Sequence, residues 1–235
     1  MITYEAYKFT ERPVADDISD CSLGNLMFFI AGTIGIAIKN GYSYGFPEWN
    51  NAKFFVNTLP EVENREFRKV DLGWGFNGFD VSDNVSLLGW MQTDKYFVHC
   101  KNIIRYYLTM KDIAEPIKDK ILIHYRNCLD EGTLIVPALR DYYLKALTYL
   151  PKKEVVVVTD NIKKAQEVIG LDCQYISDTP IKDFYLLSHA DYLVMSPSSF
   201  SWWAAWLSRA ITVAPPRWFT THDETDLYCK EWIKW

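Results

Sequence analysis

The sequence predicts an α/β protein whose second half forms a parallel, doubly wound sheet. From Ile121 onward, short apolar runs rich in valine, isoleucine and tyrosine alternate with longer segments whose apolar residues recur at helical spacing. Short apolar runs bounded by polar residues are typical of buried strands. Strands and helices in regular alternation form a parallel sheet covered by helices on both faces. These observations together define the expected fold class.

The expected elements of the second half follow one another in strict order. Five strands are expected, at 121–126, 154–160, 173–177, 191–196 and 210–215. Four helices are expected between them, at 139–150, 161–169, 181–190 and from Ser198 onward. In such a sheet the carboxyl ends of the strands meet at one edge, and ligands bind beyond that edge.

The first half is expected to be a second, more irregular domain. It opens with a long apolar helix at Leu23–Gly41, which ends at an Asn-Gly pair of the kind that terminates helices. Small residues on this helix are expected to let it pack closely on a sheet. Strands are expected at 42–46 and 85–90, a loop-rich stretch at 58–84 and an amphipathic helix at 96–110.

A change of pattern near Pro116 predicts the boundary between the two domains. Charged residues interrupt the apolar pattern between Lys111 and Lys120. The predicted domains are therefore 1–115 and 116–221. The tail 222–235 is expected to form a helix that packs back on the first domain.

Composition excludes several classes of protein. The chain has 235 residues, is 49% hydrophobic and carries a net charge of −5, which argues against a nucleic acid as partner. No apolar run approaches the roughly 20 residues that span a bilayer, and the first residues lack a signal-peptide pattern. The 5 cysteines include no CxxC pair and predict free thiols and no zinc site. A cytoplasmic protein without a transmembrane segment is expected.

The stretch SSFSWWAAWLSR, at Ser198 to Arg209, predicts a phosphate site. The preceding run DYLVMS reads as a buried strand, and Pro197 and Ser198 supply a turn and a helix N-cap. The first N–H groups of a helix lack internal partners and attract anions, and the serine hydroxyls add donors. The three tryptophans are expected to be buried and to hold the serines in place.

Polar residues follow several of the predicted strands. His124 and Arg126 end the first strand of the sheet, and Asp160 ends the second. Asp183 opens a later helix, and Arg217 follows the last strand. Together with the serines they suit a nucleoside diphosphate, with arginine on phosphate and carboxylates on base or sugar.

Each of these residues also has a purely structural interpretation. The histidine can be a core residue, the aspartates helix caps, and Arg217 a surface partner of Trp218. The sequence contains no GxxxxGK[ST] and no HExxH, so no P-loop or zinc-protease motif is present. No metal site is expected.

Six stretches carry a resemblance to a known family. They are LGNLMF, GWMQTDKYF, IHYR, DYYLKAL, PPRWF and the long block DFYLLSHADYLVMSPSSFSWWAAWLS. The sequence is similar to the α-1,2-fucosyltransferases of glycosyltransferase family 11, of which it resembles a divergent member. The resemblance extends over nearly the whole chain.

The resemblance implies a fold, a reaction and a set of site residues. The fold would be GT-B, with two Rossmann-like domains facing across a cleft. The reaction would be a metal-independent, inverting transfer from a GDP-sugar, usually GDP-L-fucose, to a glycan acceptor, with no further cofactor. By position, the residues implied in donor binding are His124 and Asp183 on guanine, Arg126 on the β-phosphate, Ser198 and Ser199 on the diphosphate, Phe200 beside them, Asp160, and Asn25 from the opposite domain.

The sequence departs from the family pattern after Arg126. The family continues with Arg-Gly-Asp-Tyr, whereas this chain has Asn127 to Asp130, followed by Glu131. Asp130 and Glu131 are the candidates for the catalytic base, beside Arg126 as the group that stabilises the leaving diphosphate. Three hypotheses remain: a GDP-fucose transferase, a transferase of another GDP-sugar, and an inactive relative that binds a nucleotide or glycan. The sequence leaves the oligomeric state open.

Overall fold

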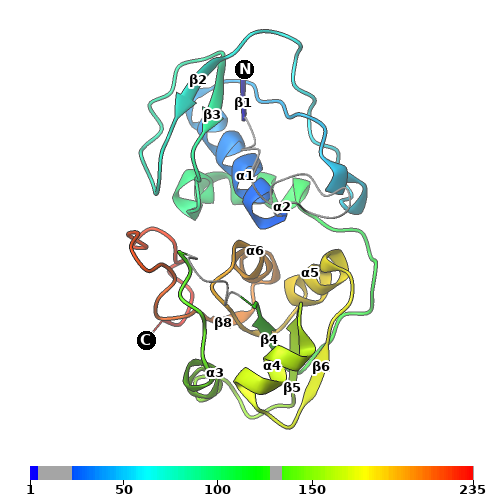
Figure 1. Cartoon of the computed structure of the whole chain (residues 1–235). Coiled ribbons are helices and arrows are strands. Elements are labelled where there is room, and N and C mark those ends of the chain that lie inside the picture. Colours follow the sequence, from blue (N-terminus) through cyan, green and yellow to red (C-terminus); the bar gives the residue numbers. More distant parts are fainter. Residues whose placement is uncertain (5–22, 128–133, 235) are drawn as a thin grey trace. The chain divides into compact units, whose positions relative to one another are not determined.

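The computed structural model describes residues 1–4, 23–127 and 134–234 and divides into two compact units. The first comprises Met1–Lys111 and the second Asp112–Trp235. The division falls shortly before the boundary expected between residues 115 and 116. Each unit has its own parallel sheet and its own helices (Figure 1).

The second unit is a five-stranded parallel sheet in the order β6-β5-β4-β7-β8. Its strands are β4 (Ile121–Tyr125), β5 (Val155–Thr159), β6 (Gln174–Ile176), β7 (Tyr192–Val194) and β8 (Ile211–Val213). Its helices are α3 (Arg140–Leu147), α4 (Ile162–Ile169), α5 (Pro180–Ser188) and α6 (Ser199–Ser208). The predicted alternation of strands and helices is confirmed for this unit.

The strand order reverses between β4 and β7, which makes this the topological switch point of the sheet. The chain moves from β4 through β5 to β6 on one side, and then returns to place β7 and β8 on the other. Ile123 of β4 lies opposite Val194 of β7, and Tyr125 lies opposite Thr159 of β5. The segments after β4, β5 and β7 therefore leave the sheet side by side, where open α/β sheets bind their ligands.

The tryptophans of α6 form part of the core, as predicted. Trp202 and Trp203 are fully buried and Trp206 nearly so. The rings of Trp202 and Trp203 meet edge to face at 5.1 Å between centroids. The indole N–H of Trp202 donates to the carbonyl oxygen of Leu227 at 2.6 Å. Helix α6 is thus fixed on its buried side, while its first turn remains at the sheet edge.

The tail 222–235 was expected to be a helix and to pack on the first domain, and both expectations are wrong. Its described residues contain no helix, and they pack on the second unit. Ile233 pairs in parallel with Val213 of β8, and the N–H of Ala214 donates to the Ile233 carbonyl oxygen at 2.9 Å. The physical reason is that β8 is an edge strand, whose unpaired backbone groups gain partners from the tail.

The first unit is built on a three-stranded parallel sheet in the order β1-β3-β2. Its strands are β1 (Ile2–Tyr4), β2 (Arg68–Asp71) and β3 (Val85–Leu88). Its helical elements are α1 (Leu23–Asn40), α2 (Lys101–Tyr107) and three short 3₁₀ turns, η1 (Asn50–Phe54), η2 (Asp94–Tyr96) and η3 (Val98–Cys100). The strand expected at 85–90 is confirmed as β3.

Two predictions for this unit are wrong. Residues 42–46 form no regular strand and make only isolated bridges at Tyr44 and Phe46. The helix expected at 96–110 is shorter, because 3₁₀ turns η2 and η3 precede α2. The strands β1 and β2 were not expected from the sequence.

Helix α1 is long and apolar enough to cross a membrane by length and composition alone. In the structure, 72% of its 18-residue window is buried within the protein. A Cβ atom on Gly35 would collide with the backbone of Tyr96, so the glycine allows α1 to pack directly on η2. The close approach predicted for this helix is therefore made to η2.

Candidate functional site

A buried histidine joins the two sides of the switch point. His124, the fourth residue of β4, is 5% exposed. Its Nδ1 lies 2.9 Å from the hydroxyl of Ser201 and 3.1 Å from the hydroxyl of Ser196. The Ser201 hydroxyl also accepts the backbone N–H of Ser196 at 3.2 Å. These contacts fix the start of α6 to the end of β4.

His124 is neutral in this environment. Burial lowers the pKa of His124 to about 3, and the positive charge of Arg126 lowers it further. Within the described residues, Nε2 has no hydrogen-bond partner, whereas Nδ1 is held by the serines. One ring nitrogen is therefore committed to the fold and the other is left for a ligand.

Two tyrosines of α3 support the same strand ends. The hydroxyl of Tyr142 donates its single proton to the carbonyl oxygen of Met195 at 2.7 Å and also lies 3.1 Å from the carbonyl oxygen of Val213. The hydroxyl of Tyr143 donates to the carbonyl oxygen of His124 at 3.5 Å. Neither tyrosine was predicted as a site residue, although both belong to the stretch DYYLKAL that carries the family resemblance. Their hydroxyls position the backbone on which the site is built.

The first turn of α6 offers hydrogen-bond donors at the sheet edge. Ser198 is the N-cap residue, as predicted, but its side chain makes no capping hydrogen bond. Ser198, Ser199 and Phe200 are partly exposed. In the described part of the chain, the two serine hydroxyls have no partner. Free hydroxyls beside free helix N–H groups are a favourable environment for phosphate oxygens.

Arg126 lies immediately after β4 and pairs with Asp160. Its Nη1 donates to one carboxylate oxygen of Asp160 at 2.7 Å, and the backbone N–H of Asn127 donates to the other at 3.2 Å. Both charged side chains are partly exposed, at 52% and 37%. In the structure, Asp160 therefore orients the arginine. A contact between Asp160 and a nucleotide stays a prediction.

Asp183 is a buried carboxyl group beside this pair. It is 7% exposed and accepts the backbone N–H of Asp178 at 3.1 Å. Burial raises the pKa of Asp183 to about 6, the Asp178 N–H opposes this, and the charges of Asp178 and Asp160 add to it. The neighbouring ring of Phe184 meets Phe200 edge to face at 5.1 Å. This contact packs α5, which carries Asp183, against the start of α6.

The remaining predicted residues make none of the contacts described above. Asn25 belongs to the first unit, where its side-chain oxygen accepts from Gln92 at 3.0 Å. Asp130 and Glu131 lie outside the described residues. Arg217 donates to the carbonyl oxygens of Phe219 and Thr220 in its own loop. Among the described residues, no three His, Cys, Asp or Glu side chains are grouped so as to hold a metal ion.

Comparison with known proteins supports a transferase. The family model for glycosyl transferase family 11 matches residues 82–235. An alpha-1,2-colitosyltransferase of Escherichia coli is 25% identical over 213 residues, covering 76% of this chain and 72% of the relative. The O-antigen biosynthesis glycosyltransferase WbnK of Escherichia coli is 28% identical over 110 residues, covering 40% of this chain and 35% of the relative.

A solved structure shares the fold. A mutant of Arabidopsis thaliana FUT1 in complex with GDP superposes with a TM-score of 0.51 at 11% identity, covering 91% of this chain and 70% of that chain. The chain is therefore an α/β glycosyltransferase with a fold of the GT-B type. Within this class, it belongs to glycosyltransferase family 11, because the family model matches more than half of its length.

Proposed function

We propose that this enzyme transfers L-fucose from GDP-L-fucose to a hydroxyl group of a glycan, with inversion at the anomeric carbon and without a metal ion. One observation carries the proposal: His124 at the end of β4, Arg126 directly after it, and the serine hydroxyls after the neighbouring strand β7 lie at the switch point. The hydroxyls of Ser198 and Ser199 have no partner among the described residues. The FUT1 structure of the same fold was solved in complex with GDP.

The base of the nucleotide is expected to contact His124 and Asp183. Guanine presents two N–H groups on one edge, which an ionised carboxylate accepts as a pair. Nε2 of the neutral histidine is free to make one further hydrogen bond in the described part of the structure. The ring of Phe200 lies 5.3 Å from that of His124 and 5.1 Å from that of Phe184. It offers an apolar contact to the base or sugar of the nucleotide.

The diphosphate is expected at the start of α6. When the bond to the sugar breaks, negative charge develops on the β-phosphate of the leaving GDP. Arg126 and the first N–H groups of α6 stabilise that charge most strongly in the transition state, which lowers the barrier. Among the described residues, Arg126 donates only through Nη1, to Asp160, so its other N–H groups are available there for phosphate oxygens. Such donors do for the diphosphate what a metal ion does in other transferases.

Inversion requires a base that removes the proton of the attacking glycan hydroxyl. We assign this role to Asp130 or Glu131, the carboxylates that follow Arg126 in the sequence. Their neighbours in the described structure are held in place. The N–H of Asn127 donates to Asp160, and the N–H of Thr220 donates to the Leu134 carbonyl oxygen at 2.9 Å.

A different donor sugar is the second candidate function. One relative is an alpha-1,2-colitosyltransferase, and colitose is a deoxy counterpart of L-fucose. A third candidate is an inactive relative that only binds a nucleotide or glycan, which the changed sequence after Arg126 favours. We also propose the cytoplasm as the compartment, because Cys100, Cys173 and Cys229 are free thiols.

Transfer assays with purified protein distinguish these functions. GDP-fucose and GDP-colitose are each incubated with a panel of oligosaccharides, and products are identified by mass spectrometry and NMR. Fucosylated product with the inverted anomeric configuration supports the proposal. Product from GDP-colitose alone selects the second candidate. Tight GDP binding without product from either donor selects the third.

A further inference from the structure

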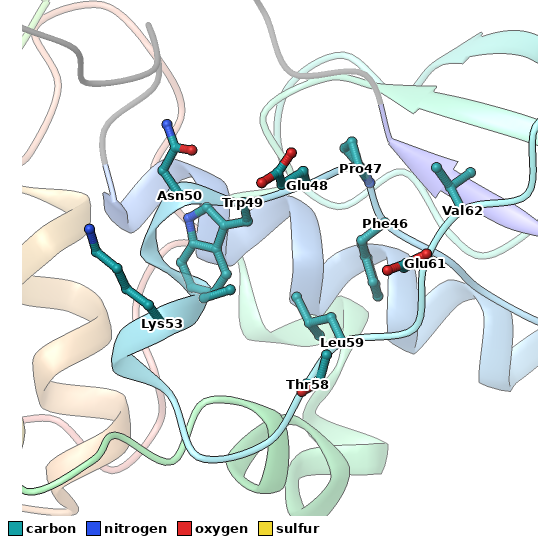
Figure 2. A pocket seen from close by; sticks show the side chains of 11 residues that line it. Phe46, Pro47, Glu48, Trp49, Asn50, Lys53, Thr58, Leu59, Glu61 and Val62 are labelled. Atoms are coloured by element: carbon teal, nitrogen blue, oxygen red, sulfur yellow. The ribbon is translucent and has the colours of Figure 1, made fainter.

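We propose that the first unit contains a binding site for a neutral saccharide, in the pocket formed by residues 46–53 and 58–62 (Figure 2). The pocket has a volume of about 1090 Å³, which is at or above the upper end of the roughly 300–1,000 Å³ typical of ligand sites. It shares no residue with the site in the second unit. Any role of this saccharide site in the transfer reaction rests on the proposed function, whereas the binding of a saccharide does not.

The backbone holds the two walls of the pocket together. The N–H of Phe46 donates to the Pro60 carbonyl oxygen at 2.8 Å, and the N–H of Val62 donates to the Phe46 carbonyl oxygen at 3.0 Å. A Cβ atom on Gly45 would lie 2.6 Å from the carbonyl oxygen of Glu61. Glycine at this position therefore permits the close approach of the two segments.

The turn η1, which carries part of the lining, is tied to the segment after α2. The N–H of Val56 donates to the Thr109 carbonyl oxygen, and the N–H of Lys111 donates to the Phe54 carbonyl oxygen, both at 2.9 Å. The Lys111 ammonium also donates to the Lys53 carbonyl oxygen at 2.8 Å. A pocket with fixed walls is preformed, and preformed sites lose little entropy when a ligand binds.

The polar groups of the pocket match sugar hydroxyls. Glu48, Asn50, Thr58 and Glu61 line it, and in the described residues their side chains have no hydrogen-bond or ionic partner. Carboxylate and amide oxygens accept hydroxyl donors, and the amide and threonine hydroxyl also donate. Two carboxylates against one ammonium, that of Lys53, disfavour a phosphate or another anion. A neutral polyhydroxyl ligand satisfies these groups without opposing their charge.

Apolar groups of the pocket match the faces of sugar rings that present C–H groups. Trp49 is 7% exposed and stacks on Phe55 at 4.8 Å between centroids. Phe46 and Leu59 also contribute to the lining (Figure 2). Ligand sites commonly combine such apolar walls with a few placed polar groups.

The indole of Trp49 supplies an independent sign of a missing ligand. Its Nε1 is buried and has no acceptor within the described structure. Buried donors are nearly always paired, because an unpaired donor loses its hydrogen bond to water without replacement. A saccharide oxygen can provide the acceptor after a small movement of the exposed side chains around it, such as Asn50.

Indole NMR tests the proposal on the whole chain. The ¹⁵N-labelled protein is titrated with galactose, glucose, N-acetylglucosamine and lactose, and the Trp49→Phe variant assigns the Trp49 resonance. At least one of these sugars is expected to shift this resonance in a saturable way. Glu48→Gln and Glu61→Gln are expected to weaken binding of that sugar by about tenfold each. Glu66→Gln, an acidic residue outside the pocket lining, is the matched control and is expected to change nothing.

Two results would overturn the saccharide site. One is the absence of a saturable Trp49 shift with every sugar. The other is unchanged sugar affinity when Glu48→Gln and Glu61→Gln are combined. GDP titration of the same samples separates the two proposals: a sugar response without GDP binding supports the pocket and contradicts the donor site of the second unit.

Discussion

Replacement of Asp183 by Asn is expected to change the affinity for GDP in a pH-dependent way. The pKa of Asp183 is about 6 in the free protein because the group is buried. Only the ionised carboxylate can accept both N–H groups of guanine, so GDP binding below that pH must first remove a proton. At about pH 5 roughly nine-tenths of the groups are protonated, and the affinity is expected to be roughly tenfold lower than at about pH 7.

The phosphates of GDP also titrate in this range, so the variant is needed to isolate the carboxyl group. Asp183→Asn keeps the size of the side chain and removes its charge. Hydrogen bonds to a charged group contribute about 1.5–3 kcal/mol, so the variant is expected to bind GDP at least about tenfold more weakly at neutral pH. Near pH 5 the two proteins are expected to bind GDP almost equally.

Isothermal titration calorimetry across this pH range measures the ratio of the two dissociation constants. A ratio that stays constant with pH, or equal affinities at neutral pH, would refute the assignment of Asp183 to the base.

Folding stability provides the control for Asp183→Asn. A raised carboxyl pKa means that the folded state holds the proton more tightly than the unfolded state. The stability contributed by this group is therefore present at low pH and is lost as pH rises through about 6. At neutral pH the Asn variant is expected to be at least as stable as the wild type in urea unfolding, so weaker GDP binding cannot be attributed to misfolding.

Three further substitutions test the supporting residues and the base. Tyr142→Phe removes the buried hydroxyl that donates to the Met195 carbonyl oxygen beside that of Val213. It is expected to lower the free energy of unfolding by about 1–3 kcal/mol in urea denaturation, whereas the exposed control Tyr106→Phe has little effect. Equal effects would contradict the role of Tyr142. Ser201→Ala removes the hydroxyl that links His124 to α6 and is expected to weaken GDP binding by about tenfold in calorimetry. Ser208→Ala is the control. Unchanged GDP affinity in Ser201→Ala would contradict a role of His124 in the site. One of Asp130→Asn and Glu131→Gln is expected to lower kcat at least about tenfold in transfer assays, and if neither does, the base lies elsewhere.

The second unit was predictable because its central strands β4 and β5 are buried on both faces. All five residues of β4 are buried, and four of the five in β5. Such strands appear in the sequence as short apolar runs, which the flanking polar residues delimit. The helices between them have the usual spacing of apolar residues, so their order defined the sheet.

The first unit was harder to predict because its strands lack that signature. Three of the four residues of β2 are exposed, so its sequence RKVD has no apolar run. Strand β1 has only three residues. Only the first part of the expected helix at 96–110 is replaced by 3₁₀ turns. In these turns the N–H of Phe97 donates to the Asp94 carbonyl oxygen, and that of Cys100 donates to the Phe97 carbonyl oxygen. Tertiary contacts, which the local sequence does not contain, decide these elements.

The candidate site was predictable as a set of residues but not as a set of contacts. The sequence placed His124, Arg126 and the serines at the ends of strands, and the sheet brings those ends together. It gave no sign that Asp160 would hold Arg126, since that pairing depends on the register of β4 and β5. The role of Tyr142 was missed because its partners are backbone carbonyl groups of distant strands.

The most direct test of the donor site is calorimetric titration with GDP of the wild type and of Arg126→Ala, in metal-free buffer with and without EDTA. We expect micromolar binding to the wild type, unchanged by EDTA, and affinity at least about tenfold weaker in the variant. Arg126 is half-exposed, so the variant is expected to keep its fold. Absence of GDP binding to the wild type, or equal affinity in the variant, would contradict the proposed nucleotide site at the switch point.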